Sequence, residues 1–243
     1  MKARQPRLRM LAGPNGSGKS TLKNVIGPKL LGAFINADEL EAKANNLGFV
    51  DFSDYQLTVD PNVLAQYSAR HDVLINHHLD NDIPSLPFEN NCLLLNRLKL
   101  NSYHASALCN FIRDELFKAE KSFSFETVMS HESKVHLLRN AQKLGYRTYL
   151  YFVGTESPDI NVVRVKERVE KGGHPVPEDK IRSRYERSIN FLYDAIGFAN
   201  RAYIFDNSHE QHEPILVAEY NGEELIARVD AIPYWLAETW ERF

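Results

Sequence analysis

Gly13-Pro14-Asn15-Gly16-Ser17-Gly18-Lys19-Ser20, followed by Thr21, is the stretch that decides the fold of this chain. It matches G-x-x-x-x-G-K-[ST], the pattern of a phosphate-binding loop. The apolar residues 8–12 before it predict a short buried strand, and residues 21–26 after it predict a helix. In this setting the backbone N–H groups of the loop point at one anion, and the new helix adds the positive end of its dipole. We therefore predict that residues 13–21 bind the phosphates of a nucleotide.

Two side chains of the loop have separate expected tasks. The Lys19 ammonium should reach the β- and γ-phosphates, and the Ser20 hydroxyl should ligate Mg²⁺. The glycines are needed because a Cβ atom would block the tight turns and the close approach of phosphate oxygens. A glycine turn that precedes a helix by chance is the alternative, and such an octamer arises in about one chain in a hundred of this length. The flanking strand and helix make that alternative rarer still.

The bulk composition excludes several classes of protein. A chain of 243 residues with a net charge of −3 is an ordinary globular composition, which disfavours nucleic acid and anionic membranes as partners. No apolar run reaches the length of a membrane span, and the apolar run after the basic N-terminus is too short for a signal peptide. Cys92 and Cys109 fit no metal spacing, so we expect reduced thiols and a cytoplasmic location.

Hydrophobic periodicity predicts an α/β protein with a mainly parallel, five-stranded sheet between two layers of helices. The expected strands are residues 8–12, 33–37, 122–127, 146–154 and 202–205. The expected helices are residues 21–31, 39–47, 63–79, 102–121, 133–144, 157–170 and 178–192. Residues 49–61 and 80–91 read as irregular or loop segments, and Ser102 as a helix N-cap. Asn221-Gly222 between two alternating runs predicts a hairpin, followed by a short helix from Pro233 to Phe243.

Asp38 follows the second expected strand, at the edge of the sheet where open α/β proteins bind ligands. Catalysis or handling of Mg²⁺ is one interpretation, and an N-cap for the helix 39–47 is the other. The histidines His71, His77 and His78 lie on one expected helix. Without further ligands beside them, we interpret these histidines as surface or core residues rather than as a metal site.

Arginines and lysines gather between residues 157 and 190, on two expected helices that Gly172-Gly173-His174-Pro175 separates. Arg184 and Arg187 are three residues apart and share a helix face. Beside a phosphate-binding loop such a helix pair is typical of a lid, because phosphoryl transfer needs fixed positive charge around the migrating group. Interleaved carboxylates would also suit a merely solvated helix pair. With the loop present, we favour the lid.

Several short motifs together resemble the zeta-toxin-like P-loop kinases and ATPases, over roughly residues 8–208. They are the loop, Asn36-Ala37-Asp38, Phe125-Glu126-Thr127, the run 152–158, the segment 172–177 with 181–185, and Phe205-Asp206-Asn207-Ser208. The resemblance implies an adenylate-kinase-like core covering residues 1–243 as a single domain. An insert at about 80–101 and the C-terminal hairpin and helix at about 213–243 have no counterpart in the toxin proper.

The resemblance also implies roles for individual residues. Asp38 matches the catalytic base and Arg168 the first lid arginine, whereas the second lid arginine is left open between Arg182, Arg184 and Arg187. Glu126 and Thr127 match the segment on the substrate side, His174 lies in the lid turn, and Asn207 falls near the adenine. The list of expected nucleotide-binding residues is Gly13, Pro14, Asn15, Gly16, Ser17, Gly18, Lys19, Ser20, Thr21 and Asn207.

The leading hypothesis is an ATP-dependent kinase that uses Mg²⁺ and transfers the γ-phosphoryl group to a hydroxyl of a small molecule. The resemblance suggests a sugar nucleotide such as UDP-N-acetylglucosamine as acceptor. Three alternatives stay open: a P-loop ATPase, the nucleotide-binding toxin of a toxin–antitoxin pair with an antitoxin protein as partner, and a polynucleotide kinase. The strand 146–154 ends in Gly154-Thr155-Glu156 rather than in aspartate, which disfavours the hydrolase.

Overall fold

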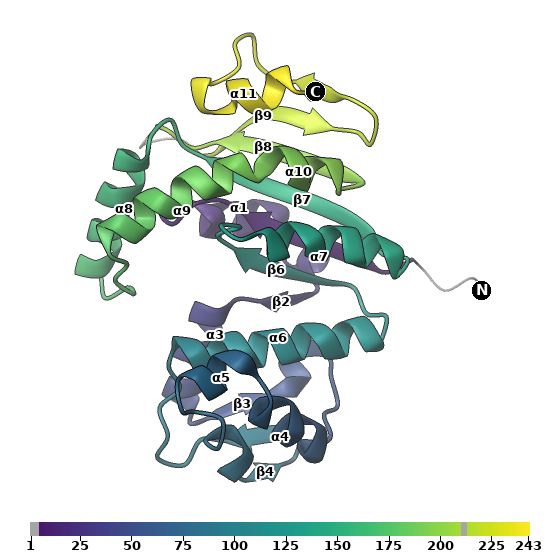
Figure 1. Ribbon diagram of the computed structural model, residues 1–243, viewed down its shortest axis with the longest axis vertical. Helices are drawn as coiled ribbons and strands as arrows, with labels where there is room; N and C mark the ends of the chain where they lie inside the picture. Colours follow the sequence, from purple (N-terminus) through teal and green to yellow (C-terminus); the bar gives the residue numbers. More distant parts are fainter. Residues whose placement is uncertain (1–4, 210–212) are drawn as a thin grey trace. The chain divides into compact units, whose positions relative to one another are not determined.

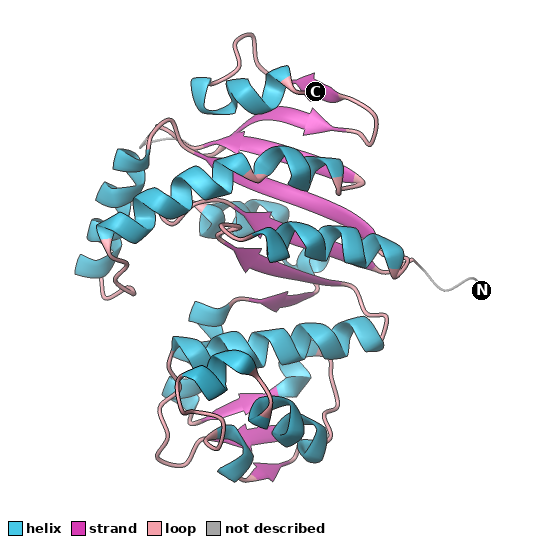
Figure 2. Cartoon of the chain, in the orientation of Figure 1, coloured by secondary structure: helices cyan, strands magenta, loops and turns pink. Residues whose placement is uncertain are grey.

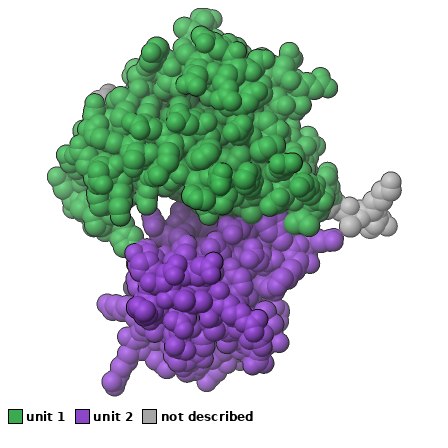
Figure 3. Space-filling model, in the orientation of Figure 1, with its two compact units in different colours: residues 1–32, 123–243 green, residues 33–122 purple. Residues whose placement is uncertain are grey.

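The computed structural model describes residues 5–209 and 213–243. The chain forms two compact units (Figure 3). Unit 1 consists of the residues up to Gly32 and those from Phe123 onward, and unit 2 is Ala33–Ser122. Each unit is described by itself below. The expectation of one domain over the whole chain stays a prediction.

The sheet of unit 1 is built around β1 (Arg7–Ala12), whose residues Leu8, Met10 and Leu11 are completely buried. β6 (Phe123–Thr127) and β7 (Arg147–Gly154) pair with β1 in parallel on either side, and β8 (Arg201–Asp206) pairs with β7 in parallel. Parallel strands end at the same edge of a sheet. The carboxyl ends of these four strands therefore bring the phosphate-binding loop, Glu126 and Asn207 to one edge.

The C-terminal hairpin extends this sheet. β9 (Ile215–Tyr220) pairs antiparallel with β8, and β10 (Leu225–Ala227) pairs antiparallel with β9. The strand order within unit 1 is β10-β9-β8-β7-β1-β6. The hairpin predicted around Asn221-Gly222 is confirmed, and so is the α/β fold class with a mainly parallel sheet.

Helices cover both faces of the sheet in unit 1. Figure 1 shows α7, α9 and α10 on one face and α1 behind the strands. The bounds are α1 (Lys19–Ile26), α2 (Pro28–Leu31), α7 (Glu132–Lys143), α8 (Pro158–Glu170), α9 (Glu178–Asn190), α10 (Leu192–Gly197), a 3₁₀ turn η3 (Tyr234–Leu236) and α11 (Ala237–Glu241). The helices α8 and α9 form a pair that shares a small core of Val162, Val165 and Ile181, with Val176 packed against it.

Unit 2 combines helices with a small antiparallel sheet of order β3-β5-β4 (Figure 2). Its elements are β2 (Ala33–Ile35), α3 (Ala37–Leu47), β3 (Phe49–Asp51), η1 (Phe52–Tyr55), α4 (Pro61–Ala69), α5 (Asp72–Asn76), η2 (Ile83–Ser85), β4 (Phe88–Glu89), β5 (Cys92–Leu94) and α6 (Ser102–Lys118). Residues 49–61 and 80–101, interpreted as irregular segments and an insert, thus contain three short strands. Two- and three-residue strands are too short to show alternation in the sequence.

Several predicted helix boundaries were wrong. The helix after the loop stops at Ile26, and the positive-φ Gly27 with Pro28 starts the separate helix α2. The single helix predicted over residues 63–79 is divided into α4 and α5. Asn101, rather than Ser102, caps α6. The Asn101 side chain accepts a hydrogen bond from the backbone N–H of His104, and the Nδ1 atom of His104 accepts one from the backbone N–H of Asn101. In the described residues no helix is long and apolar enough to cross a membrane.

The α8–α9 pair offers a test of its own core. Val165 is buried at 2% exposure, whereas Val163 on the same helix is 47% exposed. We expect Val165→Ala to lower the free energy of unfolding by about 2 kcal/mol, because buried methyl groups are lost and a cavity remains. Val163→Ala should leave stability unchanged or raise it slightly, since alanine is the better helix former. Urea denaturation of both variants measures the difference, and equal stabilities would contradict this packing.

Candidate nucleotide site

The loop between β1 and α1 has the tight conformation that its glycines permit. Gly18 is the N-cap residue of α1 and has a φ of 98°, in the left-handed region. A Cβ atom at Gly18 would also collide with the side-chain amide nitrogen of Asn207. Both backbone strain and lack of space therefore require glycine here. The first N–H groups of a helix lack an acceptor within it; in α1 the N–H groups of Thr21 and Leu22 bond the carbonyl oxygen of the N-cap residue Gly18.

Lys19 is held inside the loop. Its Nζ atom donates to the carbonyl oxygens of Gly13 and Pro14, each at 2.9 Å, and lies 3.8 Å from a carboxylate oxygen of Glu126. The side chains of Lys19 and Glu126 are 8% and 16% exposed. A buried ammonium needs such partners because desolvation penalises an unpaired charge. The contacts fix the position of the ammonium at the strand edge.

Two asparagines from distant parts of unit 1 brace the loop backbone. The Asn207 side chain, directly after β8, donates to the carbonyl oxygen of Ser17 at 2.8 Å. The Asn161 side chain, on α8, donates to the carbonyl oxygen of Asn15 at 2.6 Å. Thr155 in turn donates its hydroxyl to the carbonyl oxygen of the Asn161 side chain. The loop is thus tied to the ends of β7 and β8, so its shape does not rest on the glycines alone.

A second layer holds Asn207 in place. The neighbouring Asp206 accepts a hydrogen bond of 2.7 Å from the indole nitrogen of Trp235 and another of 2.7 Å from the Ser208 hydroxyl. The Trp235 ring lies so close to Gly154 that a Cβ atom at that position would collide with it. The C-terminal segment thereby contacts the ends of β7 and β8, next to the phosphate-binding loop.

A pocket of about 340 Å³ opens above the loop. Its described lining consists of Gly16, Gly18, Lys19, Ser20, Thr21, Glu126, Arg164, Arg168, Asn207 and His209. Three of these side chains are permanent cations at neutral pH and one is a carboxylate. The lining therefore carries a positive balance, in contrast to the negative net charge of the chain. This balance suits a polyanion such as a triphosphate.

The residues present fit a nucleotide with a divalent cation. The Ser20 hydroxyl and the Glu126 carboxylate supply hard oxygen ligands in the same pocket, and Mg²⁺ commonly takes few protein ligands because phosphate oxygens and water complete its shell. Within the part of the chain that the structure describes, no group of three or more His, Cys, Asp or Glu residues could hold a metal ion by itself. A cation at this site would depend on the phosphates.

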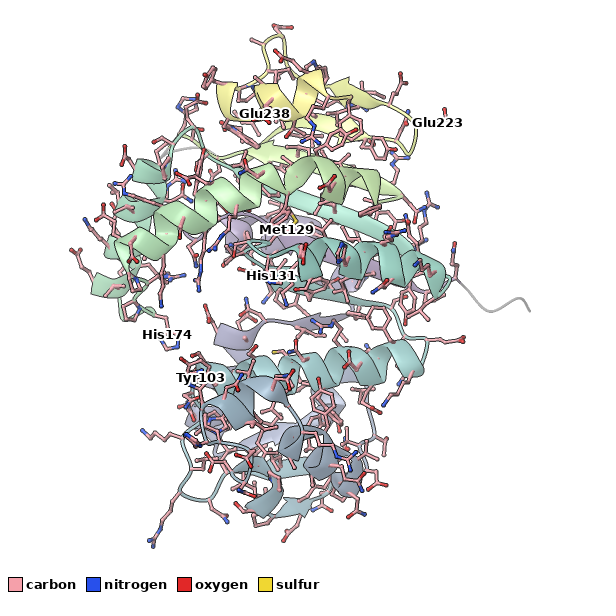
Figure 4. The ribbon with its side chains drawn as sticks, in the orientation of Figure 1. Tyr103, Met129, His131, His174, Glu223 and Glu238 are labelled. Carbon is pink, nitrogen blue, oxygen red and sulfur yellow. The ribbon has the colours of Figure 1, made fainter. Side chains whose placement is uncertain are left out.

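Of the predicted lid arginines, Arg168 lines the nucleotide pocket, and Arg182 and Arg184 do not belong to its described lining. Arg168 lines the pocket, and its guanidinium donates to the backbone oxygen of His174 at 2.8 Å. Figure 4 places His174 in the turn after α8. Arg182 instead forms ion pairs with Asp159 at 2.7 Å and with Glu178 at 2.8 Å. The hydrogen bond from Arg182 to Glu178 is the main cause that lowers the pKa of Glu178. Arg182 and Arg184 are absent from the described lining of the pocket.

Glu126 and Thr127, the residues expected on the substrate side, end β6, and the Thr127 side chain is held by a local hydrogen bond. Thr127 accepts a hydrogen bond of 3.1 Å from the backbone N–H of Met129. Met129 itself is completely buried and has a φ of 56°, a strained conformation for a residue with a side chain. Figure 4 shows Met129 and His131 in the segment that leads from β6 into α7. The chain therefore turns away from the sheet directly after Glu126 and Thr127, the last two residues of β6.

Asp38 belongs to unit 2, and the interpretation of Asp38 as a helix N-cap was wrong. Asn36 is the N-cap of α3, and its side chain accepts from the backbone N–H groups of Asp38 at 2.9 Å and Glu39 at 3.2 Å. Asp38 lies in the first turn of the helix, and its side chain is exposed. A carboxylate here is favoured by the helix dipole. Asn36 therefore caps α3 in place of Asp38, and the catalytic role of Asp38 stays a prediction.

Sequence reasoning left several pocket and brace residues out of the predicted site. Arg164 lines the pocket and donates to the backbone oxygen of Asn207 at 2.7 Å. Its spacing of four residues from Arg168 on one helix was the available signal, because such residues share a face. Asn161, Trp235 and His209 gave no comparable signal. Their relation to the loop arises from long-range contacts, such as the pairing of β1 with β7 and the hydrogen bond from Trp235 to Asp206.

Comparisons with known proteins support the fold. No family model matches the chain. One curated relative, an uncharacterised protein of Haemophilus influenzae, is 32% identical over 68 residues, which are 28% of this chain and 49% of that protein. The chain therefore spans about half the length of the curated relative it matches.

Solved structures resemble the chain over more of its length. A crystal structure of AvrRxo1-ORF1:-ORF2 with ATP has a TM-score of 0.54 at 16% identity, covering 98% of this chain and 63% of that one. The same complex with sulphate ions gives 0.51 at 16% identity, with the same coverage. A structure from the PezAT chromosomal toxin–antitoxin system of Streptococcus pneumoniae gives 0.48 at 14% identity, covering 85% of this chain and 70% of that one. This chain thus spans less than two thirds of the AvrRxo1 chain, and the two AvrRxo1 structures share its α/β fold.

Proposed function

We propose that the protein is an ATP-dependent kinase that transfers the γ-phosphoryl group to a hydroxyl of a small molecule. The observation that carries the proposal is that one pocket of unit 1 combines the phosphate-binding loop with Lys19, Glu126, Arg164 and Arg168. The AvrRxo1 relative was crystallised with ATP, which supports ATP as the donor here. A sugar nucleotide such as UDP-N-acetylglucosamine is the acceptor to test first.

The proposed roles follow from the chemistry of each group. The loop N–H groups and Lys19 hold the phosphates, and Ser20 contributes a ligand to Mg²⁺, which neutralises phosphate charge when bound. Arg164 and Arg168, four residues apart on α8, supply the fixed cationic forks around the transferred group. Asp38 takes the proton of the acceptor hydroxyl, as its match to the base of zeta toxins suggests. Glu126 and Thr127 orient the acceptor.

Incubation with γ-labelled ATP and a metabolite extract containing sugar nucleotides tests the reaction itself. The proposal expects the label to enter a compound that carries a hydroxyl. Release of the label as inorganic phosphate alone, at the same rate with and without the extract, would show a hydrolase instead.

Lys19 gives the first test of nucleotide binding. We expect Lys19→Ala to weaken ATP binding by about 10- to 100-fold, since charge-assisted hydrogen bonds to phosphate are lost. Lys29→Ala removes an equal charge from the exposed helix α2 and should bind ATP like the unmodified protein. Isothermal titration calorimetry measures both. Equal affinities of the two variants would remove Lys19 from the site.

Asp38 gives a test of the proposed base. Asp38→Asn keeps the shape of the side chain but cannot accept a proton, so phosphoryl transfer should fall by about 10²- to 10⁴-fold with ATP affinity unchanged. Glu39→Gln, one residue later in the same helical turn, is the matched control and should retain transfer. If Asp38→Asn transfers phosphate at the normal rate, another group is the base.

Asn207 gives a test of the brace. Asn207→Ala removes the hydrogen bond to Ser17 and should raise the KM for ATP by about fivefold, the equivalent of one neutral hydrogen bond. The effect should appear in KM rather than kcat, because the loop holds the donor before transfer begins. A fall in kcat at unchanged KM would mean that Asn207 acts in the transfer step and not as a brace.

A further inference from the structure

A second cavity in unit 1, of about 490 Å³, shares no described lining residue with the nucleotide pocket. One wall comes from the start of α8 and from α9, and the other from the C-terminal segment 234–242. The volume is within the range of pockets that bind small molecules. None of the roles proposed above uses this cavity.

Aromatic rings form much of the wall, and two of them are held rigidly. Tyr185 is 9% exposed and donates its hydroxyl to the backbone oxygen of Thr155 at 2.6 Å. Trp235 is 6% exposed and is anchored on Asp206. The next ring, Tyr234, is 85% exposed, the largest value among the described large hydrophobic side chains that are exposed. Aromatic faces carry negative partial charge, and they attract cations.

Carboxylates outnumber cations in the described lining of the cavity. Glu156, Glu238 and Glu241 line it, and Arg242 is the one cation in the lining that the structure describes. The Arg242 guanidinium lies 3.8 Å from the centre of the Tyr193 ring, so that ring already engages it. Burial, and then the charges of Glu156 and Asp206, raise the pKa of Tyr185 to about 12. The charges of Glu156 and Asp206 thus act on Tyr185 in the inner wall in addition to its burial.

We propose that this cavity binds a small organic cation, an amine or guanidine with an aliphatic or planar body. The rigid rings would contact the body and the cationic head, while the carboxylates at the rim would balance its charge. A bare metal ion is the poorer fit, because the described residues hold no group of three or more potential metal ligands. An anion would meet three carboxylates. The nucleotide pocket, with its positive lining, selects the opposite charge.

Calorimetry without nucleotide tests the proposal, with agmatine and spermidine as probes and glutarate as an anion of similar length. We expect the amines to bind with a Kd on the order of 0.1–1 mM and glutarate not to bind. Higher ionic strength should weaken binding, because the carboxylates are exposed and salt screens them. Lys19→Ala should bind the amines normally, so failure of the kinase proposal would leave this result unchanged.

Variants at exposed positions locate the site without endangering the fold. The double variant Glu238→Gln and Glu241→Gln should weaken agmatine binding by about tenfold, and Tyr234→Ala by about threefold. Glu223→Gln is the matched control, because Figure 4 shows Glu223 on the hairpin turn, well apart from Glu238 on α11. No binding of either amine at 10 mM, or equal loss with Glu223→Gln, would overturn the proposal; the second result would mean non-specific attraction to surface charge.

Discussion

The contact between the backbone at Gly18 and the side chain of Asn207 is the constraint on which the nucleotide site depends. A phosphate-binding loop must present backbone N–H groups, and it can do so only if the chain turns where no Cβ atom intervenes. Here the free volume beside Gly18 is filled by the Asn207 amide, which also holds the carbonyl oxygen of Ser17. Glycine permits the turn, and the asparagine selects this turn from the many that glycine would allow.

That constraint connects the ends of the chain. Asn207 follows β8, and β8 is fixed between β7 and the C-terminal strand β9. Trp235 then bonds Asp206 from the other side and packs against Gly154. The C-terminal segment therefore supports the loop at residues 13–20. Its function in unit 1 is at least to position the residue that braces the phosphate site.

Local signals predicted most of the fold, and the failures have physical causes. The loop, the five strands and the hairpin were predicted correctly because a glycine pattern, apolar runs and an Asn-Gly turn act over a few residues. Gly27-Pro28 separates α1 from α2, and Asn36 rather than Asp38 caps α3. Hydrophobic periodicity detects the helices but not which of several neighbouring residues ends or caps them. For the site, Lys19 and Arg168 were predicted and do line one pocket. Asn161 and Trp235 could not be predicted, because long-range contacts bring them to the loop: Asn161 follows β7, which pairs with β1, and Trp235 bonds Asp206 at the end of β8.

The same geometry explains why arginines of equal sequence prominence differ in what they can do. Arg182 is held by two carboxylates, so reaching a phosphate would first require breaking those ion pairs. Arg168 donates to the backbone carbonyl of His174, and Arg164 donates to the backbone carbonyls of Asn207 and His209. A neutral carbonyl is a weaker competitor than a carboxylate for a guanidinium, and phosphate is a stronger one. An anion entering the pocket would therefore draw on Arg164 and Arg168 before Arg182, which favours α8 over α9 as the helix that would hold such an anion.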